Sequence, residues 1–167
     1  NINCGPVGAC CLFDGSNRAW VNEVRYGLPR IWFNELHYDN EGEDFNEFIE
    51  VAIDSALSIS DITVYLYDGE DDDGNGIAGE VYDTLNLSSF TPGQITGGMV
   101  LYSIIHQFDG DFILQNGRSD GLAITFTDEY NVEHVVQFIS YEGSFVAADG
   151  PAAGMAAVDL GNRVLEE

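Results

Sequence analysis

Lysine is absent from this 167-residue chain, and all five of its basic residues are arginines. Against them stand 29 acidic residues, which give a formal net charge of −24 at pH 7. Such a surface repels phosphate backbones and anionic lipid headgroups, so we expect neither direct nucleic-acid binding nor attachment to an anionic membrane. The partners it attracts are metal cations, salt or a basic protein surface, and the same charge serves solubility in a salty or extracellular medium.

Long hydrophobic runs are also missing, because no apolar stretch approaches the roughly 18 to 20 residues that a membrane-spanning helix needs. Hydrophobic residues nevertheless make up 45% of the chain. A chain of this length can bury a substantial apolar core. We therefore expect one globular domain and no transmembrane segment.

Cysteine is confined to the first eleven residues, as Cys4, Cys10 and Cys11. A disulfide from Cys4 to either of the other two would close a short loop and leave the third thiol free or paired with another chain. A zinc site is disfavoured, because zinc usually takes four ligands and the nearest histidine is far along the chain. We therefore divide the chain into a Cys-containing N-terminal segment, residues 1–28, and a domain, residues 29–167, whose core needs no disulfide.

Helical periodicity is absent too, since no stretch combines a 3.6-residue apolar repeat with capping residues. Short apolar stretches instead alternate with turn residues, at the spacing typical of a sandwich or barrel. In FNEFIEVAI, for example, alternation places Glu47, Ile49, Val51 and Ile53 on one face. The sequence therefore predicts an all-β, mostly antiparallel fold. The predicted strands, about eight in number, are 31–38, 45–53, 62–67, 81–87, 99–105, 112–114, 122–127 and 135–140.

Three stretches carry motifs that are similar to those of a known protein family. They are IWFNELHYDNEGEDFNEFIEVA at 31–52, NGRSDGLAITFTDEYNVEHVVQFISYEG at 116–143, and FVAADGPAAGM at 145–155. Together they resemble the bacterial-type lamin-tail domain, which occurs in secreted multidomain proteins, often beside an endonuclease/exonuclease/phosphatase domain. The resemblance implies an immunoglobulin-like β-sandwich and a non-catalytic role in attachment or interaction. The family usually has a short turn where this chain has DGEDDDGNG at 68–76, and the segment before residue 28 has no family counterpart.

The stretch DGEDDDGNG is the first candidate site. It contains the spacing D-x-D-x-N-G, in which alternate oxygen ligands on a tight turn can converge on calcium and the glycine permits the bend. An EF-hand would continue to a glutamate at its twelfth position, where this chain has Tyr82, so a glutamate two residues earlier would have to serve in a different geometry. The alternatives are a second, overlapping register of ligands, Asp68, Glu70 and Asp72, and a solvated hairpin loop. The predicted calcium ligands are Asp71, Asp73, Asn75 and Glu80.

The second candidate site is the turn between the first two predicted strands of the domain. Its carboxylates and one asparagine could form an oxygen cage for calcium, while Glu50 points to the opposite face of its strand. His37 suggests a transition metal, but the neighbouring ligands are the oxygens that calcium prefers. The alternative is that Asp and Asn make turn hydrogen bonds. The predicted ligands are Asp39, Asn40, Asp44 and Glu47.

Catalytic motifs are scarce. Glu35 and Glu50 could be a glycosidase pair, but among 29 acidic residues some pair is always available. No G-x-S-x-G nucleophile turn occurs. We therefore predict a non-enzymatic structural, adhesion or interaction subunit, secreted and calcium-stabilised. The alternatives are an accessory subunit of a larger assembly in an organelle lumen, with its acidic face against a basic partner, and an accessory domain cut from a secreted nuclease or phosphatase.

Overall fold

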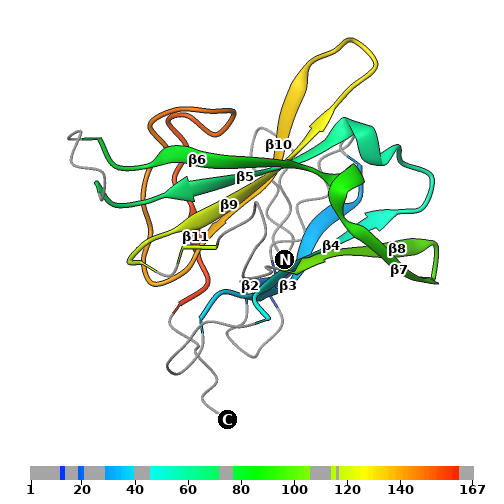
Figure 1. The fold of residues 1–167 in the computed structure, drawn as a ribbon. Coiled ribbons are helices and arrows are strands. Elements are labelled where there is room, and N and C mark those ends of the chain that lie inside the picture. The colour runs from blue at the N-terminus through cyan, green and yellow to red at the C-terminus, as the bar shows by residue number, and fades with distance from the viewer. Residues whose placement is uncertain are drawn as a thin grey trace.

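The computed structural model describes residues 12–13, 19–20, 29–39, 46–71, 77–105, 114–115 and 117–161. Within these ranges, nine strands form two packed sheets, and a short pair outside them joins β1 (Leu12–Phe13) to β2 (Ala19–Trp20) (Figure 1). The helices of the described part are two single 3₁₀ turns, η1 (Ile59–Asp61) and η2 (Leu87–Ser89). The predicted all-β sandwich is confirmed.

The strand order identifies the topology. One sheet has the order β3-β4-β8-β7 and the other has the order β11-β10-β9-β5-β6. If the strands from β3 to β10 are lettered A, B, C, C′, D, E, F and G, the orders become A-B-E-D and G-F-C-C′, which is the immunoglobulin arrangement. The strands are β3 (Ile31–His37), β4 (Phe48–Asp54), β5 (Ile62–Asp68), β6 (Glu80–Asn86), β7 (Thr91–Thr96), β8 (Met99–Ile105), β9 (Gly121–Thr127), β10 (Glu133–Ser140) and β11 (Val158–Asp159).

Strand alternation decides which side chains fill the space between the sheets. In β5, Ile62, Val64 and Leu66 are fully buried, and the aliphatic residues of β4 meet them from the other sheet. Each such side chain stabilises the fold by about 1.5 to 3 kcal/mol relative to an exposed one. The buried face read from the sequence is also correct, because Ile49, Val51 and Ile53 of β4 are buried, as is Glu47 just before the strand.

A second, smaller core lies on the outer face of the five-stranded sheet. The C-terminal segment after β10, drawn in orange to red in Figure 1, runs along this sheet. Its residues Ala147, Ala152 and Ala157 pack with Tyr67 and Phe138 of the sheet. The sheet is therefore covered on both faces in this region, which explains why the first five residues of β9 are all buried without alternation.

Two strands differ from the prediction. The stretch TPGQIT forms β7, although its proline and glycine argue against a strand. Proline is tolerated there because β7 is an edge strand, and the register shifts between Pro92 and Ile95. β11 is only two residues long and pairs in parallel with β10, so no local pattern announces it. Of the predicted strand 112–114, only Leu114 is described; it is buried and not in a strand.

Candidate functional site at the acidic end of the sandwich

The fold brings the two predicted acidic turns to the same end of the sandwich. Tyr38, which follows β3, stacks on Tyr141, which follows β10, with ring centroids 4.0 Å apart. Gly121 pairs with both Ser140 at the end of β10 and Tyr67 near the end of β5. The ends of β3, β5 and β10 therefore meet. We call this region the acidic end; its described carboxylates are Asp39, Glu47, Asp68, Glu70, Asp71, Glu80, Asp120, Glu142 and Asp149.

The stretch DGEDDDGNG connects β5 to β6 as a hairpin. Asp68 pairs with Glu80 at the last position of the ladder, and the Gly79 N–H donates to the Asp68 carbonyl at 2.7 Å. The Asp68 carboxylate accepts from the Glu70 N–H at 2.9 Å, so it shapes the start of the loop. Beside the base of the hairpin lies an open hollow of about 350 Å³, lined by Asp68, Glu70, Ile77, Glu80, Val81, Tyr82 and Gln115.

The β5 side of this hairpin is held by the turn that precedes β9. Asp120 is only 2% exposed, and its two carboxylate oxygens accept from the Gly69 N–H at 3.2 Å and the Gly117 N–H at 3.0 Å. Hydrogen bonds to a charged acceptor are stronger than neutral ones. A Cβ built on Gly69 would lie 1.8 Å from the Ser119 carbonyl oxygen, so only glycine permits this approach.

The β6 side of the hairpin is held by the C-terminal segment. The Asp149 carboxylate accepts from the Val81 N–H at 2.8 Å, and the Ala148 N–H donates to the Gly79 carbonyl at 2.7 Å. Gly79 has a φ of 86°, a left-handed backbone conformation that residues other than glycine rarely adopt. Both ends of the acidic loop are thus fixed by residues far away in the sequence.

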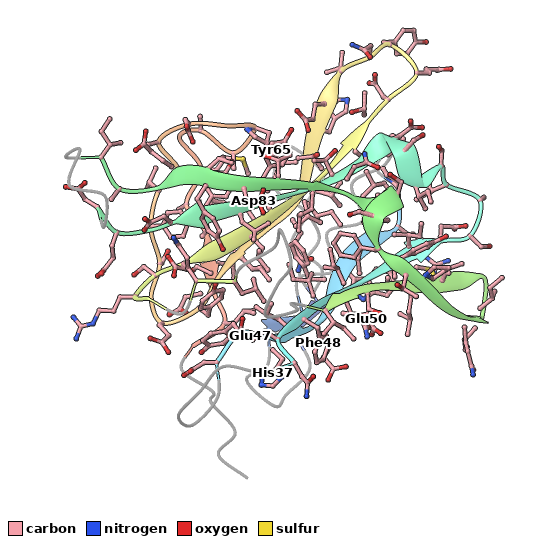
Figure 2. The ribbon with its side chains drawn as sticks, viewed as in Figure 1. His37, Glu47, Phe48, Glu50, Tyr65 and Asp83 are labelled. Atoms are coloured by element: carbon pink, nitrogen blue, oxygen red, sulfur yellow. The ribbon has the colours of Figure 1, made fainter. Side chains whose placement is uncertain are left out.

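The second candidate site is organised around β3 and β4. Figure 2 shows His37, Glu47 and Phe48 together at the ends of these strands, away from Tyr65 and Asp83 on the other sheet. The His37 ring meets Phe48 edge-on, with centroids 5.9 Å apart, and its Nε2 lies 3.1 Å from the Asp39 carbonyl oxygen. Histidine here supports the turn through backbone and aromatic contacts. Glu47 is only 1% exposed, so its side chain is buried rather than presented to solvent.

A group of tyrosines lies behind the two acidic turns. The Tyr141 hydroxyl donates to the Gln115 carbonyl at 2.6 Å, and the Gln115 N–H donates to the Tyr82 hydroxyl at 3.2 Å. Burial raises the pKa of Tyr141 and of Tyr82 above the ordinary tyrosine value. Burial, aided by the nearby Glu142 carboxylate, raises the pKa of Tyr38 to about 12. These phenols therefore stay neutral at physiological pH and serve packing and hydrogen bonding.

The structure tests the predicted calcium ligands only in part. Among the residues that the structure describes, no three His, Cys, Asp or Glu side chains come together to hold a metal ion. Calcium binding therefore stays a prediction. The described predicted ligands are Asp39, Glu47, Asp71 and Glu80, and those outside the described residues are Asn40, Asp44, Asp73 and Asn75. The predicted disulfide of Cys4 with Cys10 or Cys11 also lies outside them.

Neither of the residues that brace the loop was among the predicted site residues. Asp120 and Asp149 each precede a glycine, a pair typical of turns, and this was the available signal. It does not reveal that each carboxylate reaches a hairpin more than fifty residues away in the sequence.

The candidate glycosidase pair, Glu35 and Glu50, lies on adjacent strands. The two residues face each other across β3 and β4. The Glu50 carboxylate accepts from the Asn34 side chain at 2.7 Å.

Comparisons with protein-family models, with curated protein sequences and with solved structures each found no match to this chain. The resemblance to lamin-tail domains therefore rests on the three sequence motifs and stays a prediction. Within the described ranges, no helix is long and apolar enough to cross a membrane.

Proposed function

We propose that this chain is a non-catalytic β-sandwich module that serves as a structural, adhesion or interaction subunit outside the cytoplasm. In this proposal the acidic end binds calcium and faces a basic protein partner. The observation that carries the proposal is the bracing of the β5–β6 hairpin, whose two ends are held by Asp120 and Asp149. Loop ends that are held in place lose little conformational entropy on binding, so bracing favours recognition.

Electrostatics supports the choice of ligand. The chain carries a net charge of −24, and a surface of one sign speeds the approach of oppositely charged partners. Three acidic residues, Asp68, Glu70 and Glu80, are among those that line the hollow beside the hairpin. Carboxylate and amide oxygens are the ligands that calcium prefers. Calcium would also relieve the repulsion among these clustered charges.

The contacts of the two described histidines, and of the buried tyrosines, support the proposal of a non-catalytic role. His37 contacts the Asp39 carbonyl, and His134 Nε2 lies 2.7 Å from the Asp128 carboxylate in the turn between β9 and β10. The buried tyrosines are held neutral by their surroundings. Of these groups, Tyr82 lines the hollow, and its raised pKa keeps it protonated, so it is not an activated base. The lamin-tail resemblance, whose implied topology agrees with the observed strand order, favours the same role.

Thermal unfolding with calcium, with magnesium and with a chelator tests the proposal. A ligand that binds only the native state stabilises it by about 2.7 kcal/mol at a hundredfold excess over its dissociation constant. We expect millimolar calcium to raise the melting temperature, and Asp71→Asn combined with Glu80→Gln to reduce that rise. Glu129→Gln, in the turn at the opposite end, is the matched control and should leave the rise intact. An unchanged melting temperature in millimolar calcium would contradict calcium binding.

A further inference from the structure

The C-terminal segment exposes apolar side chains on a protein that is otherwise strongly acidic. Val146 is 56% exposed, Val158 is 57% exposed and Leu160 is 53% exposed, and Met155 is also exposed. These are four of the nine large hydrophobic residues exposed in the described part of the chain. Single exposed apolar residues need no explanation, but a group in one segment marks an interaction surface.

Pairing and alternation place three of these side chains, Val146, Val158 and Leu160, on one side of the segment. Val146 and Ala156 form an antiparallel bridge, and bridged residues point to the same side. From Ala156 the chain is extended, so Val158 and Leu160 follow on the same side, while the intervening Ala157 is buried in the second core. Met155 is exposed beside Ala156. We call Val146, Ala156, Val158 and Leu160, together with the adjacent Met155, the C-terminal apolar stripe.

The stripe is held by backbone pairing with the neighbouring strand β10 and within the segment itself. Val158 pairs with Ile139 of β10, and the Leu160 N–H donates to the Ser140 carbonyl at 2.8 Å. The Ala157 N–H donates to the Phe145 carbonyl at 2.9 Å. The apolar side chains are therefore presented on ordered backbone, so that little entropy is lost when a partner covers them.

Charge decides which partner fits. Asp149 and Asp159 belong to the same C-terminal segment as the stripe, and both are exposed. A second copy of the chain would bring another net charge of −24 against the first. We propose that the stripe docks an extended segment of a basic protein in which apolar residues alternate with arginine or lysine. The apolar residues would cover the stripe, because its own side chains recur at every second position, and the cations would meet the flanking carboxylates.

This inference names the partner chemistry for the proposed interaction role, and it does not depend on calcium. The probes are two synthetic peptides of equal length and charge, one alternating leucine with arginine and the other alternating glycine with arginine. Isothermal titration calorimetry on the full chain measures both. We expect the leucine peptide to bind about tenfold more tightly, since covering apolar side chains adds at least the 1.4 kcal/mol that a tenfold change requires.

Val158→Ser combined with Leu160→Ser should remove the preference for the leucine peptide. Ile95→Ser, at a 70% exposed residue of β7, is the matched control and should keep it. Met155→Ser, also within the stripe, should weaken the preference on its own and guards against misfolding of the double variant. Equal affinities for the two peptides, a preference that survives the double variant, or dimerisation of the wild type in analytical ultracentrifugation would each overturn the inference. The calcium-site variant Asp71→Asn with Glu80→Gln should keep the preference, so the two proposals can fail separately.

Discussion

Asp120 provides the most direct test of how the acidic hairpin is held. Its carboxylate is buried and accepts two backbone N–H groups, from Gly69 and Gly117. Each hydrogen bond to a charged group contributes about 1.5 to 3 kcal/mol. Both glycines are partly accessible, so water can satisfy some of the freed N–H groups, and the lower end of the range applies. We expect Asp120→Ala to lower the free energy of unfolding by about 3 kcal/mol.

Urea denaturation measures this change. With a denaturant slope of about 2 kcal/mol per molar, the expected loss moves the midpoint down by about 1.5 M. Asp120→Asn keeps the shape but places an amide N–H₂ opposite one backbone donor, so it should lose about 2 kcal/mol. Asp159→Ala is the matched control, because its carboxylate accepts one N–H, from Gly161, at an exposed site. The reasoning is refuted if Asp120→Ala stays within about 0.5 kcal/mol of the wild type.

Two further predictions concern close packing and pH. Gly69→Ala would place a Cβ against the Ser119 backbone and should destabilise the fold by about 3 kcal/mol, whereas Gly97→Ala, with a φ of 59° and open space, should cost about 1 kcal/mol in the same denaturation assay; equal costs would contradict the packing argument. Burial raises the pKa of Tyr38 and of Tyr65 to about 12. The protonated phenols are favoured in the native state, so their contribution to stability is complete below pH 10 and is lost as pH rises from about 10 to 12. Tyrosinate absorbance should therefore show a late fraction that coincides with unfolding, and a single titration near pH 10 in the folded protein would contradict this.

The acidic end and the C-terminal apolar stripe are linked by one segment of the chain. Asp149 braces the β5–β6 hairpin, and it lies between Val146 and Met155 of the stripe. The same segment also closes the second core through Ala147, Ala152 and Ala157. One short segment thus packs its buried alanines against the sheet and exposes its apolar stripe to solvent.

Much of the fold was predictable because the strongest signals are local. Alternation in β4 and β5 predicted which side chains are buried, since the side chains of a strand alternate between faces. The edge strand β7 could not be read in this way, because all six of its residues are exposed and no alternation remains. The hairpin made by DGEDDDGNG was predicted from its flanking strands. Its ligand role stays a prediction, because Asp73 and Asn75 lie outside the described residues.

The sequence by itself determined the class of the fold, the extreme negative charge and the positions of both acidic turns, because composition, alternation and turn residues act over a few neighbours. Only the tertiary structure decided that the two turns share one end of the sandwich and that Asp120 and Asp149 hold the hairpin between them. It also decided that Val146 and Val158 are exposed on a segment in which Ala147, Ala152 and Ala157 are buried. These features depend on contacts between residues far apart in the chain, and such contacts are set by how the two sheets pack rather than by any local pattern.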